Sequence, residues 1–185
     1  MQHSPRHGWS RRRLLAASSA LVAAPGGTAS AANGGTGLDG PRRLVAVRDA
    51  DGTNRVLADG PSPNRFDLNG TRIVRLWEAP TVPVTLPVTA DTAPGSGSAY
   101  RDGFRGASFY TAEIPPGVGR AQVPMHRNAT LDYMAVLRGQ IVLLLPGREI
   151  PLAQGDTLVL AGCDHSWENR GAETCALLFV VLPAA

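Results

Sequence analysis

Hydrophobic and polar residues alternate with a period of two in many short runs along this chain of 185 residues. Most runs end at a Gly-, Pro-, Asn- or Asp-containing turn, which is typical of half-buried β-strands. Neither an amphipathic helix of useful length nor an internal repeat is evident. Many short strands with glycine-marked turns predict an all-β fold, either a sandwich or a closed barrel. The expected strands are 44–48, 55–58, 72–78, 106–114, 131–137, 140–145, 157–161, 165–169 and 175–182.

Two segments have the composition of connectors rather than of strands. Residues 32–40 are rich in Gly, Asn and Thr, which predicts a flexible linker. Residues 79–98 contain four prolines and many Ser and Thr, which predicts a loop or mobile flap between two strands. A plain surface connection is the simpler interpretation of this loop, and a lid over a substrate is the alternative.

The first 31 residues have the pattern of an export signal. Arg11-Arg12-Arg13 precede an apolar run from Leu14 to Ala24, and Ala29-Ser30-Ala31 suits signal-peptidase cleavage. The paired arginines and the mildly apolar, alanine-rich run resemble a twin-arginine signal. An ordinary secretory signal and a misplaced start codon are the alternatives. We therefore expect a signal peptide at 1–31, a connector at 32–40 and one domain at 41–185, exported to the periplasm or outside the cell.

Net charge depends strongly on this leader. Residues 32–185 carry fourteen arginines against fifteen acidic residues, so the exported part is near neutral although the whole chain has a net charge of +3. A near-neutral domain gives no electrostatic reason to expect nucleic-acid binding, and no membrane association is expected after signal removal. The sequence has no lysine, which excludes a lysine Schiff base or lysine general base.

Two short motifs contain the only histidines that follow the leader. Six residues separate His126-Arg-Asn128-Ala-Thr-Leu-Asp132 from Gly139, and Gly155-Asp156 is followed by His165-Ser-Trp-Glu-Asn169. Their spacing resembles the two motifs of small single-domain cupins, the cupin-2 type of conserved barrel. The resemblance implies a cupin jelly-roll β-barrel with its core at about 120–182 and extra N-terminal strands. Asn128 stands where the family pattern has His, and Asp132 where it has Glu.

The resemblance implies a metal site, because cupins bring these motif positions together inside the barrel. Position by position, the ligands would be His126, Asn128, Asp132 and His165, with one divalent ion of iron, manganese, nickel, zinc or copper. Two imidazoles and a carboxylate would form a facial triad with open coordination positions. His126, Asp132 and His165 are also the expected catalytic residues, as general acids and bases if no metal is bound. Trp167 is the expected cofactor- or ligand-lining residue, and a core position is its alternative.

Three functions remain open at this point. We expect first a metal-dependent enzyme, such as an oxygenase, isomerase or lyase, that acts on a small and largely apolar organic molecule. The alternatives are a cupin that binds a small molecule without catalysis and a structural module that forms a homodimer. Family resemblance alone does not name a substrate.

Cys163 and Cys175 are the only two cysteines. Strands 165–169 and 175–182 are expected to form a hairpin that places Cys175 opposite Glu168 and leaves Cys163 out of register for a disulfide. Two free thiols are therefore expected. A disulfide and a nucleophilic Cys163 beside His165 are the alternatives.

Overall fold

Eleven β-strands make up the regular structure of the described residues. The computed structural model describes residues 40–95, 98, 100–101 and 103–184, so the predicted signal peptide and nearly all of the linker lie outside the described residues. None of the described residues forms a helix that is long and apolar enough to cross a membrane. The strands are β1 (Arg42–Arg48), β2 (Asn54–Pro61), β3 (Arg65–Leu68), β4 (Thr71–Ala79), β5 (Ala107–Ile114), β6 (Thr130–Arg138), β7 (Gln140–Leu145), β8 (Arg148–Ala153), β9 (Thr157–Ala161), β10 (Ser166–Glu168) and β11 (Cys175–Pro183).

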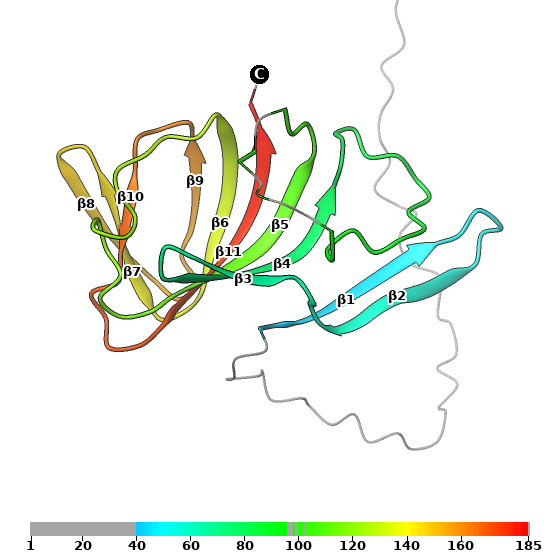
Figure 1. Cartoon of the computed structure of the whole chain (residues 1–185), viewed down its shortest axis with the longest axis horizontal. Coiled ribbons are helices and arrows are strands. Elements are labelled where there is room, and N and C mark those ends of the chain that lie inside the picture. Colours follow the sequence, from blue (N-terminus) through cyan, green and yellow to red (C-terminus); the bar gives the residue numbers. More distant parts are fainter. Residues whose placement is uncertain (1–39, 96–97, 99, 102, 185) are drawn as a thin grey trace, which may run out of the picture. The chain divides into compact units, whose positions relative to one another are not determined.

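The strands form one large sheet, one small sheet and a separate hairpin. The large sheet has the order β3-β4-β5-β11-β6-β9, the small one has the order β10-β7-β8, and β1 pairs only with β2. All strand pairs are antiparallel. The large sheet curves towards the small one (Figure 1). This is the all-β, jelly-roll arrangement expected from the sequence, with β1 to β4 as the additional N-terminal strands.

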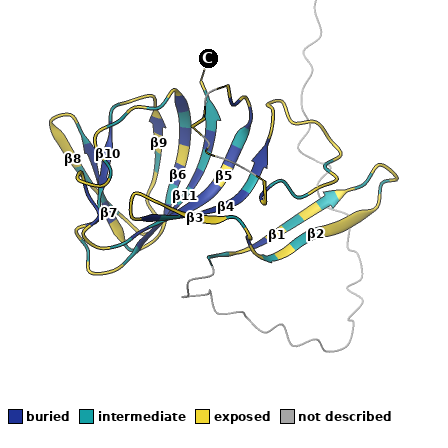
Figure 2. Cartoon of the chain, viewed as in Figure 1, coloured by how far each residue is buried: buried dark blue, intermediate teal, exposed yellow. Residues whose placement is uncertain are grey.

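The interior of the barrel lies between the two sheets and is filled by alternate residues of each strand. Its apolar core includes Ile73, Tyr110, Leu177 and Phe179 from the large sheet and Ile141 from the small sheet. Figure 2 shows buried positions concentrated on the large sheet, whereas β2 and β8 are mostly exposed. The alternation in the sequence therefore corresponds to the inner and outer faces of each strand.

Two strands were not predicted, and one predicted pairing is wrong. β3 has four exposed residues and therefore no buried face, whereas β8 alternates between exposed residues and the half-buried Ile150 and Leu152 but contains Pro151. β10 and β11 do not form a hairpin, because β10 pairs with β7 in the small sheet and β11 pairs with β5 and β6 in the large one. Cys175 is consequently opposite Ile114 rather than Glu168. The turn between these strands carries the chain from one sheet to the other.

The segment between β4 and β5 contains no strand among its described residues, as predicted for 79–98. It is held at its ends by a parallel bridge between Thr81 and Arg105. Gly106 is required here, because a Cβ atom at this position would lie 1.7 Å from the carbonyl oxygen of Ala79. The mobility of this segment stays a prediction.

One buried arginine connects the β1–β2 hairpin to the rest of the domain. Arg43, which is 8% exposed, donates to the carbonyl oxygen of Leu76 at 3.2 Å and to Oδ1 of Asp91 at 2.9 Å. Its other terminal nitrogen donates to Oδ2 of Asp91. This bidentate ion pair lowers the pKa of the Asp91 carboxyl, chiefly through the hydrogen bonds from Arg43.

Candidate functional site

The two motif histidines are neighbours in space although 39 positions separate them in the sequence. The amide of His126 donates to the carbonyl oxygen of His165 at 2.9 Å, and the reverse bond is 2.8 Å long. Their ring centroids lie 4.3 Å apart. The backbone pairing thus holds both imidazoles at one end of the barrel, as the cupin resemblance implies.

Backbone carbonyls determine which nitrogen of each neutral ring carries the proton. Nδ1 of His126 lies 2.9 Å from the carbonyl oxygen of Pro124, and Nδ1 of His165 lies 3.0 Å from that of Cys163. A carbonyl can only accept, so both Nδ1 atoms are protonated and both Nε2 atoms keep a lone pair. Burial lowers the pKa of His165, and the hydrogen bond with the Cys163 carbonyl only partly opposes this effect. The lowered pKa favours the neutral form of His165.

Asp132 is the buried acid of the site. It is 2% exposed and faces inward from β6, whereas the adjacent Tyr133 is 46% exposed and faces outward, as predicted. Its Oδ2 accepts a hydrogen bond from the Tyr100 hydroxyl at 3.1 Å, and its Oδ1 has no hydrogen-bond partner among the described residues. Burial raises the pKa of Asp132, and hydrogen bonds from Thr130 and Tyr100 partly offset this effect.

Two tyrosines that the sequence did not single out connect Asp132 on β6 to β5 of the same sheet. The hydroxyl oxygens of Tyr100 and Tyr110 lie 2.7 Å apart. Since Tyr100 donates to Asp132, Tyr110 is the donor in this second bond. Tyr110 is fixed by stacking on Phe179, with ring centroids 4.7 Å apart, and by the Arg75 guanidinium 4.9 Å from its ring centre. The result is a directed chain of hydroxyl groups that ends on the carboxyl group.

Tyr100 comes from the segment between β4 and β5, and the next residue anchors that segment to the barrel. Arg101 donates to both carboxylate oxygens of Glu78, at 3.0 and 2.8 Å. Its guanidinium also lies 4.0 Å from the ring centre of Phe104. Tyr100 lies two residues beyond the predicted connection at 79–98, and it contributes its side chain to the site. The Pro-, Ser- and Gly-rich sequence before it contains no periodic signal that could have located Tyr100.

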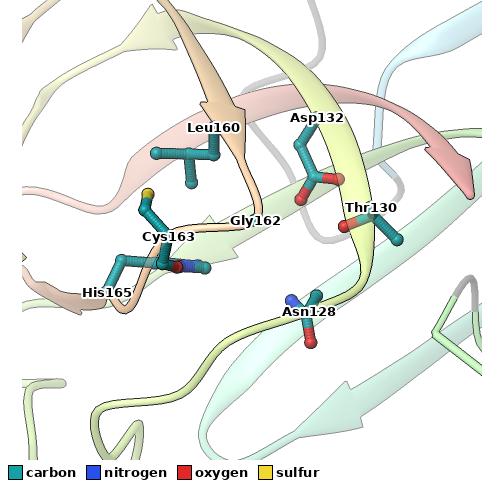
Figure 3. A pocket seen from close by; sticks show the side chains of 7 residues that line it. All are labelled: Asn128, Thr130, Asp132, Leu160, Gly162, Cys163 and His165. Carbon is teal, nitrogen blue, oxygen red and sulfur yellow. The ribbon is translucent and has the colours of Figure 1, made fainter. Parts of the chain in front are cut away.

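A small pocket opens beside Asp132 and His165. Thr130 and Asp132 on β6 face Leu160 on β9, and the segment after β9 contributes Cys163 and His165 (Figure 3). The pocket encloses about 140 Å³ of empty space, its open mouth included. Pockets for drug-sized ligands have roughly 300 Å³ or more, so this one fits an ion or a molecule of a few atoms. Its complete lining is Asn128, Thr130, Asp132, Leu160, Gly162, Cys163 and His165.

Two of the predicted site residues lie outside this lining. His126 is beside His165 but does not line the pocket. Trp167 is 6% exposed and belongs to the apolar core, with its ring centroid 6.0 Å from that of His165 in an edge-on arrangement. Trp167 thus supports the ring of His165 from within the core. Asn128, in contrast, lines the pocket together with Asp132 and His165.

The predicted ligands fit a metal in chemistry but not in position. Two imidazoles with available Nε2 atoms and one carboxylate oxygen without a partner among the described residues are suitable donors. However, no group of three or more His, Cys, Asp or Glu side chains in the described part of the chain is arranged so that it could hold a metal ion. Instead, the hydroxyl of Tyr100 donates a hydrogen bond to one carboxyl oxygen of Asp132.

Arg127 and the two cysteines are further polar residues near the site. Arg127 does not pair with Asp132, because its Nε lies 3.1 Å from Oδ1 of Asp164. Cys163 is exposed, Cys175 is buried, and both are free thiols. Burial raises the pKa of Cys175 to about 11, which makes this thiol a poor nucleophile near neutral pH.

Comparison with known proteins agrees with the fold. Residues 110–181, from β5 to β11, match the family model described as "Cupin domain". The range contains His126, Asp132 and His165. Two curated relatives from Diaporthe leptostromiformis, Phomopsin biosynthesis cluster protein D and protein C', are each 29% identical to this chain. The matches cover 78% of this chain and 79% of each relative.

Solved cupin structures are similar to this chain at low sequence identity. The polyketide cyclase RemF from Streptomyces resistomycificus is 21% identical, with a TM-score of 0.43 over 67% of this chain and 70% of the cyclase. A Cupin 2 conserved barrel domain protein from Salinispora arenicola is 20% identical, with a TM-score of 0.44 over 65% of this chain and 82% of that protein.

Proposed function

We propose that the cupin domain binds a small molecule bearing hydroxyl or amino groups and acts on it by proton transfer. This proposal rests on three side-chain atoms at one end of the barrel that have lone pairs available to accept hydrogen bonds. Nε2 of His126, Nε2 of His165 and Oδ1 of Asp132 can all accept a hydrogen bond. A ligand that satisfies such groups must donate, which a hydroxyl or amino group does.

The groups differ in the proton transfer that each can perform. His165 is buried in the pocket wall, and its lowered pKa keeps it neutral and able to accept a proton near neutral pH. Asp132 is held by Tyr100 on one oxygen and presents the other to the pocket. The lining is more polar than expected for a largely apolar ligand, since Leu160 is the only large apolar side chain in it.

Matched ligand pairs test this proposal. Small diols and amino alcohols should raise the melting temperature of the protein, whereas alkanes and ethers of equal length should not. The effect should disappear in His165→Ala and Asp132→Asn and persist in Val56→Ala, an exposed position on β2. Equal stabilisation by the apolar congeners would contradict the proposal. The names of the two curated relatives, which refer to a biosynthesis cluster, agree with a function on small molecules.

A transition-metal site is the second candidate, favoured by the protonation of both Nδ1 atoms. An imidazole ligand of a metal commonly donates its other ring N–H to a carbonyl or carboxylate, as His126 and His165 do. His126, His165 and Asp132 would hold the ion, which requires movement of these side chains from their present positions. Elemental analysis of untagged protein tests it. About one ion per chain, lost in His126→Ala and His165→Ala, supports a metal site; metal-free protein after anaerobic incubation with each ion excludes it.

We also propose that the chain is exported by the twin-arginine route, on the basis of Arg11 and Arg12. The receptor of this route reads the arginine pair, whereas the general route needs only positive charge. Changing both residues to Lys should leave the precursor in the cytoplasm, as measured by cell fractionation. Export of the double variant at the normal rate would contradict the assignment.

A further inference from the structure

The hydroxyl group of Tyr100 occupies a position that few chemical groups can fill. It donates a hydrogen bond to Oδ2 of Asp132 at 3.1 Å, and the hydroxyl oxygen of Tyr110 lies 2.7 Å from it. Because the single hydroxyl proton of Tyr100 points at Asp132, the Tyr100 oxygen accepts the proton of Tyr110. The position therefore requires a group that both donates and accepts, as a hydroxyl group does.

Other polar groups satisfy only one of the two neighbours. An ammonium group donates to Asp132 but cannot accept from Tyr110, and an ether or carbonyl oxygen accepts but cannot donate. Asp132 is 2% exposed and Tyr110 is 4% exposed, so leaving either side chain without its partner is costly. The position thus selects hydroxyl groups over amines and ethers.

Tyr100 differs from its two partners in how it is attached to the fold. Asp132 on β6 and Tyr110 on β5 belong to paired strands of the large sheet, and Tyr110 also stacks on Phe179. Tyr100 lies between β4 and β5, in a segment whose described residues form no strand, and it is 39% exposed. Its departure would break no strand pairing, whereas Asp132 and Tyr110 are fixed by the sheet.

A partly exposed ion pair anchors Tyr100 through the next residue. Arg101 donates to both carboxylate oxygens of Glu78, at 3.0 and 2.8 Å, and to the carbonyl oxygen of Ser98 at 2.7 Å. The side chain of Arg101 is 37% exposed, so solvent screens its attraction to Glu78. Ion pairs of this kind contribute little to stability, so the anchor opposes the departure of Tyr100 only weakly.

We infer that Tyr100 is a built-in competitor for the site, and that a ligand hydroxyl binds between Asp132 and Tyr110 by displacing it. This inference rests on the proposed function and narrows its ligands from hydroxyl or amino compounds to hydroxyl compounds. The carboxyl group of Asp132 points into the pocket of about 140 Å³ (Figure 3). Displacement of Tyr100 adds the space of its ring to this pocket, because Asp132 borders both.

Phenol is the probe that reproduces the displaced group, and anisole and aniline are its matched controls. Anisole cannot donate, and aniline accepts poorly because its lone pair is delocalised into the ring. Titration of the full chain at neutral pH should give a dissociation constant for phenol at least about tenfold lower than for either control, since each control leaves one buried group without a partner. Tyr100→Ala should bind phenol at least about tenfold more tightly than the wild type, because the competitor is absent.

The three tyrosines of the chain report the displacement directly. In protein labelled with fluorotyrosine, fluorine NMR should show the Tyr100 resonance moving towards that of the free amino acid as phenol is added. The resonance of Tyr110 should shift within its buried environment. The resonance of Tyr133, which is 46% exposed on the outer face of β6, should stay unchanged and serves as the internal control.

Weakening the anchor should tighten the binding of phenol. Arg101→Gln removes the ion pair with Glu78 and raises the fraction of molecules from which Tyr100 has departed. The apparent dissociation constant for phenol should therefore fall about two- to fivefold. Arg42→Gln is the matched control and should leave it unchanged, because Arg42 also donates to both oxygens of a carboxylate, that of Asp59, but on the β1–β2 hairpin. Should Tyr100→Ala fail to fold, Arg101→Gln provides the comparison with the wild type.

Three results would overturn the inference. Phenol that binds no better than anisole would contradict the requirement for a hydroxyl group, and phenol that binds without moving the Tyr100 resonance would bind elsewhere. The third is an absence of binding to the wild type and to Arg101→Gln at about 50 mM, above the millimolar effective concentration of a tethered group.

Failure of this inference and failure of the proposed function have different signatures. Small diols that stabilise the protein while the Tyr100 resonance stays in place would support the proposed function and contradict only the displacement. Phenol that displaces Tyr100, together with diols and amino alcohols that give no stabilisation dependent on His165, would contradict the proposed function and support the displacement, because His165 does not contact Tyr100 in the hydrogen-bonded chain.

Discussion

The two ends of the barrel interior are built from the same strands but from different kinds of residue. At one end, a row across the large sheet consists of Glu78, Ser108, Val181, Asp132 and Leu160. At the other end, the corresponding row consists of Ile73, Ala112, Leu177 and Val136. All nine residues are buried. Burial alone therefore does not distinguish the two ends; the presence of ionisable groups does.

The difference indicates that the two ends of the barrel interior have different roles. Apolar side chains without polar atoms fill the second end, and their burial stabilises the fold by about 25 cal/mol per Å². The buried acid at the first end has a raised pKa and one oxygen without a partner among the described residues, which costs stability. Groups kept in such an environment are candidates for function. Substitutions at the two ends should consequently have opposite signatures.

Leu177→Ala should have the largest effect on stability. The side chain is fully buried in the centre of the apolar row, and its truncation should lower the free energy of unfolding by about 2–5 kcal/mol. Leu68→Ala is the matched control, because Leu68 lies in the same sheet on β3 and is 53% exposed. Denaturation with urea measures both. Similar losses of unfolding free energy in the two variants would contradict the conclusion that this end of the barrel stabilises the fold.

Asp91 provides a contrasting carboxylate whose role is structural. Unlike Asp132, it is paired with an arginine, and its pKa is lowered rather than raised. Asp91→Asn should destabilise the protein by about 1–3 kcal/mol at neutral pH, because the buried Arg43 loses its anionic partner.

The pH dependence of this effect follows from the direction of the pKa shift. A carboxyl whose pKa is lower in the folded state stabilises the protein above its unfolded value of 3.8, and this stabilisation is lost as the pH falls through the folded pKa. The difference in stability between the wild type and Asp91→Asn should therefore shrink in acid. Urea titrations from pH 7 to pH 2 measure it, and a constant difference would contradict the ion-pair explanation.

Tyr100→Phe should have a smaller effect, because it removes the hydroxyl group with its hydrogen bonds to Asp132 and from Tyr110 and leaves the ring in place. We expect a loss of about 1 kcal/mol, reduced by the partial exposure of the tyrosine. Tyr133→Phe, on the outer face of β6, is the control and should change stability by less than about 0.5 kcal/mol. Equal effects of the two variants would show that the Tyr100 hydroxyl does not support the acid.

The sequence predicted the fold better than it predicted the site, for physical reasons. Alternation of apolar and polar residues predicts half-buried strands, so the bounds of β4, β5, β6 and β11 were predicted closely. The same alternation placed Asp132 inward and Tyr133 outward. β3 has no buried face and could not be found in this way. The pairing of β10 with β7 could not be predicted, because the order of strands along the chain does not specify which sheet each strand joins.

The site was predicted only where a motif covers it. The spacing of the motifs located His126, Asp132 and His165, and the register of β6 confirms the inward position of Asp132. Tyr100 reaches Asp132 from 32 positions away, out of a segment that has no periodic pattern. For Trp167 the sequence left a pocket position and a core position open, and the tryptophan lies in the core, because a residue two positions from His165 can share its face without reaching the pocket.

Asp132→Asn should have the smallest effect on stability of the substitutions inside the barrel. It is therefore the sharpest test of the comparison between the two ends of the barrel interior. The amide has the same shape as the carboxyl and can still accept the hydrogen bond from Tyr100, while the cost of burying an ionisable group is removed. We expect a change of less than about 1 kcal/mol in the free energy of unfolding, in either direction. Ligand-induced stabilisation should nevertheless be lost, because the amide nitrogen that replaces Oδ1 cannot accept a hydrogen bond from the ligand. The same urea and thermal-shift measurements as for Leu177→Ala give both quantities. A large loss of stability in Asp132→Asn would mean that this acid, like Asp91, holds the fold together, and the two ends of the barrel would then no longer differ in role.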